Sequence, residues 1–180
     1  MNPIFLALFF TFTSPALALS SSETDLRALW ARPSAKLLEA FKKSCSKPNN
    51  IDFDGRGGDL FASLQKKAHV LQIRALVYAE KNCSDGSGRE AVLGALGNEI
   101  LLQHPAKLIQ ALHEEKRTDL GKIVEQENND WFAVECEDDT CRNNRKAYFA
   151  KKRKALESVK GKKAWGPIKS DLLSQLQSDK

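Results

Sequence analysis

Three aspartates and three glycines lie together in residues 52–59, which makes this stretch the first candidate for chemistry. Asp52, Asp54 and Asp59 could offer oxygen ligands to a divalent cation. A calcium loop of the EF-hand type needs ligands at its fifth and twelfth positions, where this sequence has Arg56 and Ser63. We therefore interpret the stretch as a glycine-rich turn in which Asp59 caps the next helix. The alternative is a metal-dependent hydrolase or a divalent-cation-binding protein that uses the carboxylate cluster.

The three histidines do not complete a catalytic or metal-binding motif. His113-Glu114 begins like the zinc motif H-E-x-x-H, but Arg117 stands where the second histidine must be. His69 is interpreted as a surface or boundary residue and His104, before Pro105, as a helix-capping residue. Motifs for phosphate loops, dinucleotides and serine nucleophiles are also missing. We therefore expect no catalytic residues, no metal site, no cofactor and no enzyme activity.

The four cysteines favour two disulfides. Cys136 and Cys141 are close enough in sequence to form a local bridge, which would leave Cys45 to pair with Cys83. The other two pairings remain possible from the sequence, and a four-cysteine zinc site is the competing interpretation.

The N-terminus is typical of a secretory signal peptide. Residues 4–10 are an apolar run too short to span a bilayer, the first charged residue is Glu23, and Ala16 and Ala18 suit a signal peptidase. No Lys or Arg precedes the run, which leaves an uncleaved anchor as the alternative. We expect residues 1–20 to be a signal peptide, residues 21–180 to be a single all-helical domain without a membrane span, and the location to be extracytoplasmic, secreted or in a bacterial periplasm.

Composition and periodicity favour an all-α fold. Hydrophobic residues make up 42% and charged residues 28% of 180, with a net charge of +5, which excludes disordered and collagen-like chains. Apolar residues recur at helical spacing, and no segment alternates like a strand. The predicted helices are 25–43 with an interruption at Pro33, then 59–81, 89–103, 105–116, 118–127, 143–159 and 168–176.

Charge is strongly segregated along the chain. Residues 114–139 carry ten acids and three bases, a net charge of −7, and residues 142–169 carry eleven bases and one acid, a net charge of +10. Tyr148 and Phe149 are expected in the core and the basic residues on the solvated face of their helix. The basic helices 142–180 thus offer a candidate binding surface, formed by Arg145, Lys146, Lys151, Lys152, Arg153, Lys154, Lys162 and Lys163.

The predicted helices 89–103, 105–116 and 118–127 have lengths and turns similar to HEAT-type α-solenoid units. The likeness covers about forty residues with generic Leu, Ile and Ala spacing, and no second copy recurs at a fixed period. The expected fold is therefore a disulfide-stabilised irregular multi-helix bundle, with a short HEAT-like stack of helical hairpins as a variant of it. No functional residue follows from this resemblance.

The sequence thus predicts an exported, non-enzymatic helical binding protein with a charge-segregated surface. Its expected partner is a protein or an anionic component of the cell envelope. Nucleic acid is disfavoured as a partner, because the aromatic residues of the basic helix are expected in the core. The simplest alternative for the basic block is a solvated helix face without a partner. The sequence does not indicate an oligomeric state.

Overall fold

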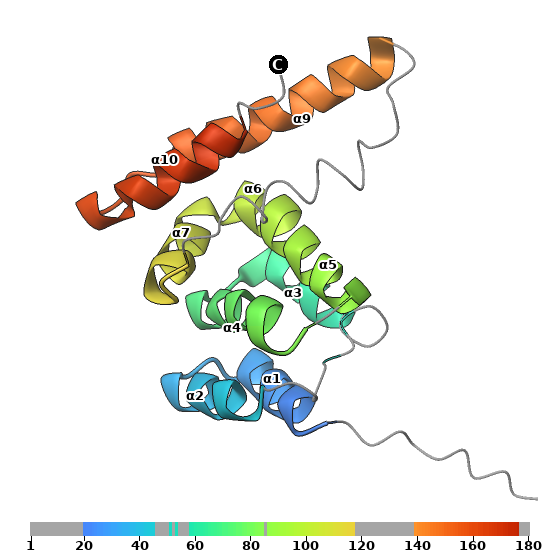
Figure 1. Ribbon diagram of the computed structural model, residues 1–180, viewed down its shortest axis with the longest axis vertical. Coiled ribbons are helices and arrows are strands. Elements are labelled where there is room, and N and C mark those ends of the chain that lie inside the picture. The colour runs from blue at the N-terminus through green and yellow to red at the C-terminus, as the bar shows by residue number, and fades with distance from the viewer. Residues whose placement is uncertain are drawn as a thin grey trace, which may run out of the picture.

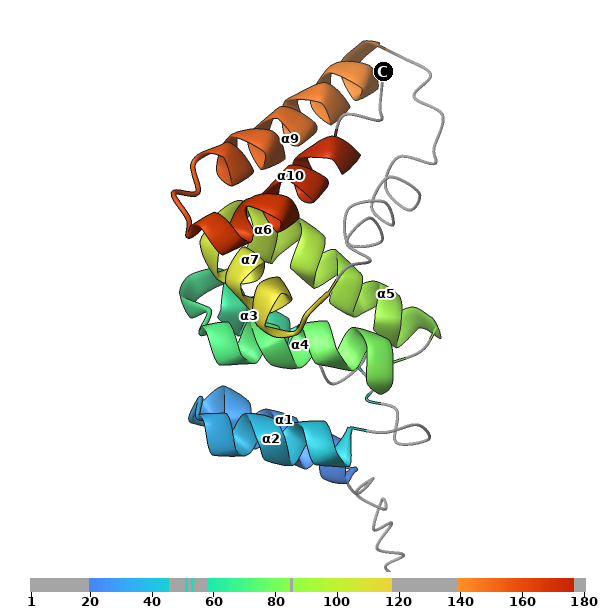
Figure 2. The same ribbon diagram turned by 60° about the vertical axis from the view of Figure 1, so that its left-hand side comes forward.

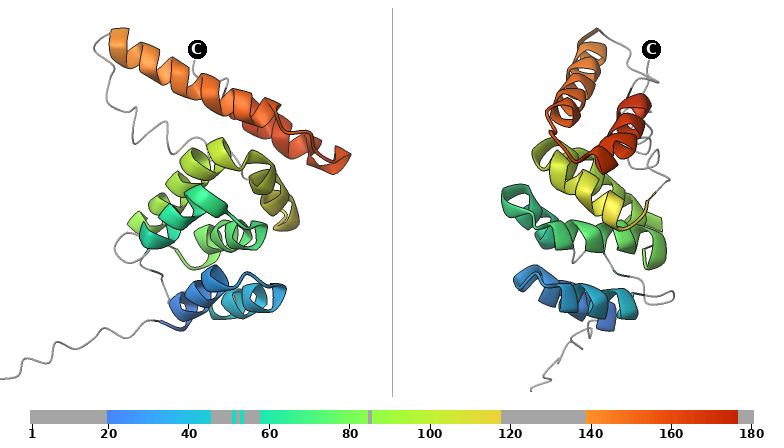
Figure 3. Two further views of the ribbon diagram at one scale, coloured as in Figure 1. Left: turned by 180° about the vertical axis from the view of Figure 1, so that it is seen from behind. Right: turned by 90° about the vertical axis from the view of Figure 1, so that its left-hand side faces the viewer.

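The computed structural model describes residues 20–45, 51, 53, 58–84, 86–117 and 139–176. Over these residues the secondary structure is helical with no strand, so the predicted all-α class is confirmed. Figure 1 shows the helices in three tiers along the long axis: α1 and α2 at one end, α3 to α7 in the middle, and α9 and α10 at the other end. Figures 2 and 3 show the same tiers from other sides.

The first tier is a helical hairpin whose break comes from Pro33, as the sequence predicts. Helix α1 spans Ser21–Ala31 and α2 spans Ala35–Ser44. Ser20 and Ser34 cap the two helices, since each hydroxyl accepts a hydrogen bond from the backbone N–H three residues later, at 3.2 and 3.3 Å. Leu26, Leu29, Leu38 and Phe41 are the buried apolar side chains of this pair.

The predicted helix 59–81 is wrong as one continuous helix, because the structure divides it at Ala68 and His69. Helix α3 spans Gly58–Lys67 and α4 spans Val70–Asn82. His69 begins α4 with a capping box: its ring accepts from the N–H of Leu71 at 3.2 Å, and Gln72 Oε1 accepts from the N–H of His69 at 2.8 Å. The apolar stripe continues through the break, which explains why periodicity alone predicts one helix.

The middle tier continues with a helix pair that turns at Pro105. Helix α5 spans Gly86–Gly94, a π-helical segment η1 spans Ala95–Ile100, α6 spans Leu101–Gln103, and α7 spans Pro105–Glu114. The proline has no N–H and stands in the first turn of α7, where none is needed. These bounds confirm the predicted break at His104-Pro105.

The third tier consists of two helices joined by a connection that contains a short 3-10 segment. Helix α9 spans Asp139–Glu157, a 3-10 segment η2 spans Lys163–Trp165, and α10 spans Gly166–Gln175. Figure 1 shows α10 turning back along α9. The predicted helix 118–127 and the predicted signal peptide 1–20 lie outside the described residues, apart from Ser20. Among the helices that the structure describes, none combines the length and apolarity that a bilayer crossing needs.

Helix α4 is the centre of the packing, because it contacts α1, α2, α5, η1 and α7. Its Ile73, Leu76 and Val77 side chains have no exposed surface. A disulfide between Cys45 at the end of α2 and Cys83 at the end of α4 joins the first two tiers, which confirms the predicted pairing of these cysteines. Burial of apolar surface on several sides of one helix should make α4 a large contributor to the stability of this fold.

An ionic contact reinforces the junction between the first two tiers. The Glu115 carboxylate, next to the end of α7, accepts from Lys42 Nζ at 2.7 and 2.9 Å and from Arg74 Nε at 2.6 Å. Only 7% of the Glu115 side chain is exposed, so both cations compensate a charge that has lost most of its water. Residues of α2, α4 and the end of α7 are thereby held in one arrangement.

Candidate functional site

Helix α9 places many of the basic residues of the chain on one element. It contains neither glycine nor proline and is rich in Ala, Lys and Arg, which are good helix formers. Its buried stripe consists of Phe149, Lys152 and Leu156, and the helix packs against α6 and α7 of the middle tier. The rest of its circumference is available to charged side chains, as amphipathic spacing requires.

Two basic side chains hold α9 and α10 together as a hairpin. Lys169 Nζ donates to the backbone carbonyls of Glu157 and Val159 at 3.0 and 3.1 Å. Its positive charge there also interacts favourably with the negative C-terminal end of the α9 helix dipole. Arg153 donates to the carbonyl of Leu176 at 3.4 Å, at the end of α10. We call residues 139–176 the basic hairpin, since they carry eleven Lys and Arg residues and three acids, a net charge of +8.

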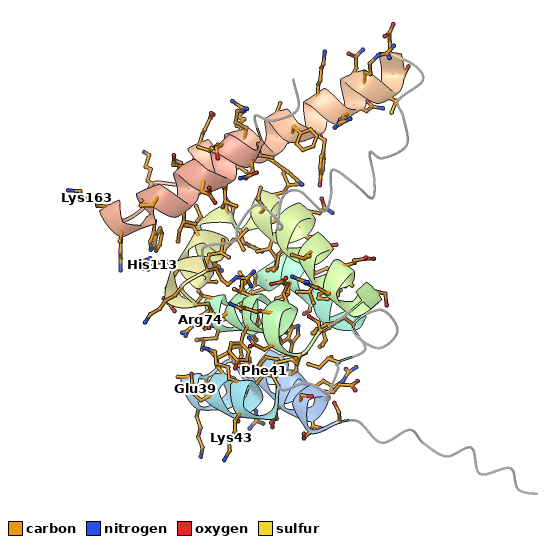
Figure 4. All side chains as sticks on the ribbon, viewed as in Figure 1. Glu39, Phe41, Lys43, Arg74, His113 and Lys163 are labelled. Carbon is orange, nitrogen blue, oxygen red and sulfur yellow. A yellow bond between two sulfur atoms is a disulfide. The ribbon has the colours of Figure 1, made fainter. Side chains whose placement is uncertain are left out.

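The structure separates the eight predicted surface residues into three groups by exposure. The side chains of Arg145 and Arg153 are half-buried, and the Arg145 guanidinium lies 5.9 Å from the ring centroid of Phe149. Lys152 is buried. Five of the eight are exposed: Lys146, Lys151, Lys154, Lys162 and Lys163. Figure 4 shows Lys163 at the far end of the hairpin from the start of α9.

Lys152 does not belong to the solvated face on which the sequence analysis placed it. Its side chain has no exposed surface, and Nζ lies 4.5 Å from the ring centroid of Tyr148. Burial lowers the pKa of Lys152 from 10.5 to about 7, because the charged ammonium is separated from water. The helical spacing already contains this signal, since Lys152 follows Phe149 by three residues and precedes Leu156 by four.

Tyr148 connects the basic hairpin to the π-helical segment of the middle tier. Its hydroxyl donates a hydrogen bond to Asn98 Oδ1 in η1. Burial raises the pKa of Tyr148 to about 12, so the hydroxyl stays protonated and can donate throughout the physiological range. Phe149 and Tyr148 are thus used for packing and docking of α9, as expected for aromatic residues on its apolar face.

The carboxylate cluster receives no support from the structure. Asp52 and Asp54 lie outside the described residues, and Asp59 is the second residue of α3. Within the described ranges, no group of three or more His, Cys, Asp or Glu residues could hold a metal ion. The metal-dependent alternative for Asp52, Asp54 and Asp59 therefore stays a prediction.

The histidines occupy structural positions. His69 begins α4, and the ring Nε2 of His104 is 3.1 Å from the carbonyl of Leu64 in α3. His104 occupies the predicted cap position of α7 but makes no capping hydrogen bond with its side chain. His113 is exposed on α7. His69 and His104 thus have contacts that belong to the fold, and no contact of this kind is described for His113.

The second predicted disulfide is described only at one end. Cys141 is disulfide-bonded, and its predicted partner Cys136 lies outside the described residues. The local Cys136–Cys141 bridge stays a prediction.

Sequence reasoning missed a second group of basic residues, Lys81, Lys116 and Arg117. These residues come from α4 and from the segment after α7, and they line one cleft. No spacing rule could join them, because their proximity depends on how α4 packs against α7. Comparison with protein-family models, curated proteins and solved structures finds no match to this chain, so its function has to be argued from the residues themselves.

Proposed function

We propose that this chain is an exported, non-enzymatic helical binding protein that docks through its basic hairpin. The observation that carries the proposal is the exposure of Lys146, Lys151, Lys154, Lys162 and Lys163 on one helical hairpin with a net charge of +8. Such a concentration of ammonium groups attracts polyanions over about one Debye length, near 8 Å at physiological salt. The Cys45–Cys83 disulfide is compatible with an oxidising compartment outside the cytoplasm.

The partner we favour is an anionic surface of the cell envelope, with an acidic protein as the alternative. Lysine ammonium groups bind anionic headgroups without needing a fixed geometry, so a row of them suits an extended surface. A protein partner would be expected to use large aromatic anchors as well. The aromatic residues of the basic hairpin are instead buried or half-buried: Tyr148, Phe149 and Trp165.

Charge reversal on the hairpin tests the proposal. We expect the full chain to sediment with phosphatidylcholine vesicles that contain phosphatidylglycerol, and to do so less as salt rises. The triple variant Lys146→Glu, Lys151→Glu, Lys154→Glu should weaken this binding by roughly a hundredfold or more, at about 1 kcal/mol for each lysine removed and a further repulsive contribution. Vesicle co-sedimentation at low salt measures the loss.

The matched control reverses three exposed lysines on other tiers, Lys36→Glu, Lys43→Glu and Lys67→Glu, and has the same net charge. It should keep most of the binding. The proposal fails if the control loses as much as the hairpin variant, or if vesicles of phosphatidylcholine alone bind the chain equally well. Stronger retention on single-stranded oligonucleotides than on the anionic vesicles would also contradict it.

A further inference from the structure

A cleft of about 240 Å³ lies between the C-terminal half of α4 and the residues that follow α7. It belongs to the middle tier and is separate from the exposed lysines of the basic hairpin. A water molecule occupies about 30 Å³ of liquid, so the cleft has room for a small organic ion. It is lined by Val77, Tyr78, Lys81, Asn82, Glu115, Lys116 and Arg117.

The electrostatics of this cleft favour an anion. The one acid among the described lining residues, Glu115, is bound by Lys42 and Arg74, each within 2.7 Å of a carboxylate oxygen, and Arg74 also binds Glu114 at 2.9 Å. Lys81, Lys116 and Arg117 are the cations of the lining. Among the lining residues that the structure describes, the cations therefore outnumber the acid, which favours an anionic ligand.

Arg117 enters the cleft from a well-fixed position. Its guanidinium donates to Glu80 Oε2 at 2.6 Å and to the carbonyl of Val77 at 2.9 Å. Arg89 also binds Glu80, at 2.7 Å from Oε1, so two arginines share this buried carboxylate. These contacts fix the Arg117 guanidinium, so it does not need to reorganise in order to receive an anion.

The backbone at Lys116 adds an independent observation. Lys116 has φ of +51° and is the only non-glycine residue with positive φ in the described ranges. It is the second residue after α7, where the N–H of Arg117 bonds back to the carbonyl of Leu112 at 3.0 Å. Glycine is the usual residue at this left-handed position at a helix end, and here the chain has a lysine whose side chain lines the cleft.

The remaining walls suit an organic group. Tyr78 is half-buried beside buried Val77, and Asn82 is half-buried with its amide held by the carbonyl of Tyr78 at 2.8 Å. The ring of Tyr78 already receives Lys42 Nζ at 5.2 Å from its centroid. An aromatic side and a cationic side face the same space, which is the usual arrangement for a ligand with one apolar and one charged part.

We propose that this cleft binds a small phosphate monoester. A monoester phosphate carries close to two negative charges at neutral pH and three acceptor oxygens, which suit the two lysines and one arginine of the lining. Its organic group would lie against the half-buried side chain of Tyr78. This binding is independent of the basic hairpin, and it does not rest on the function proposed above.

Titration calorimetry of the full chain with phenyl phosphate tests the proposal. We expect one molecule to bind per chain, with Kd of about 1 mM or tighter for a ligand of this size. Lys81→Ala and Lys116→Gly should each weaken binding by roughly tenfold. Lys116→Gly is the sharper variant, because it also removes the unfavourable backbone conformation and should raise the melting temperature, which excludes misfolding as the cause of weaker binding.

Lys43→Ala is the matched control, since Lys43 is an exposed lysine on α2 that does not line the cleft, and Figure 4 shows it on the outer side of the first tier. It should bind phenyl phosphate like the wild-type chain. The proposal is overturned if no saturable binding occurs at tens of millimolar phenyl phosphate, or if Lys81→Ala and Lys116→Gly bind as tightly as wild type. It is also overturned if Lys43→Ala loses as much affinity, or if succinate binds as tightly as phenyl phosphate.

Discussion

At Lys152 the position on the helix and the chemistry of the side chain oppose each other. The apolar face of α9 needs a residue that can be buried there, and the chain supplies a lysine with no exposed surface. The rings of Tyr148 and Phe149, with centroids 4.5 and 6.0 Å from Nζ, offset part of the lost hydration through cation–π attraction. Desolvation remains the larger effect, since the pKa of Lys152 is lowered to about 7.

This burial makes stability depend on pH. Between about pH 7 and pH 10.5, the unfolded chain holds a proton on Lys152 that the folded chain releases. The contribution of Lys152 to the free energy of unfolding therefore rises with pH across this window. Below pH 7 the buried side chain is charged, and it then destabilises the folded chain by its full amount. Lys152→Met should raise the free energy of unfolding at pH 6 by about 2–4 kcal/mol and remove this dependence. Urea unfolding at pH 6 and pH 9 measures both effects.

The control for this prediction is Lys151→Met, which changes the exposed neighbour and should shift stability by less than about 0.5 kcal/mol. Equal pH dependence in wild type and Lys152→Met would contradict the assignment to Lys152.

At the residue scale, sequence periodicity could predict which aromatic residues of α9 face inward. It could also have predicted the burial of Lys152, but composition suggests that a lysine in a basic block faces water. Lys116 could not be predicted in the same way, because its positive φ depends on where α7 ends and how the chain continues. The cleft residues were beyond sequence reasoning for the same reason.

At the scale of elements, helix ends are determined by contacts that come from other helices. The Gln72 side chain takes part in the capping box of α4 and also donates to the carbonyl of Trp30 in α1 at 3.1 Å. Lys107 of α7 donates to the carbonyl of Ala68 at 2.6 Å, directly after α3. The break between α3 and α4 is therefore stabilised from two sides, which a single apolar stripe does not reveal.

The turn of the basic hairpin depends on a glycine. A Cβ atom on Gly161 would lie 2.7 Å from Cε3 of Trp165, closer than packed side chains allow. Gly161→Ala should therefore lower the free energy of unfolding by about 1–3 kcal/mol through overpacking of the turn. Thermal unfolding of the full chain checks the direction and the size.

Gly94→Ala is the matched substitution in a helix. A Cβ there meets nothing within 4 Å, and the backbone is already helical, with φ of −58° and ψ of −47°. It should stabilise the chain by about 0.5–1 kcal/mol. A stabilising effect of Gly161→Ala of similar size would show that Trp165 can move without loss of packing.

At the scale of the whole molecule, the three tiers explain why helices could be predicted and their arrangement could not. Helical periodicity reports which face of each helix is buried, but not which helix covers it. The pairing of Cys45 with Cys83 was the long-range contact that the sequence did suggest, and it joins the first tier to the second. No feature of the sequence indicates the contacts of α9 with α6 and α7.

This disulfide should contribute strongly to stability, because it closes a loop with a sequence separation of 38 residues. The loop-entropy relation gives about 4 kcal/mol for that length. Replacement of both residues, Cys45→Ala with Cys83→Ala, should lower the free energy of unfolding by about that amount in guanidinium titrations. Substitution is preferable to reductant, because Cys141 is also disulfide-bonded and would be reduced as well.

Cys45→Ala alone should lose the same loop constraint and give nearly the same free energy of unfolding. A loss below about 1 kcal/mol in the double variant would contradict the expected loop constraint.

The Cys45–Cys83 bond also turns residues 45–83 into a covalent ring that contains all of α3 and α4. A single proteolytic cut inside this ring does not divide the molecule, because the two pieces remain joined through sulfur. Such a nicked chain would run as one band without reductant and as two bands with it. A cut within α5 or α7 falls outside the ring and has no such protection from this bond. The topology thus gives residues 45–83 and the helices outside this ring different responses to the same protease.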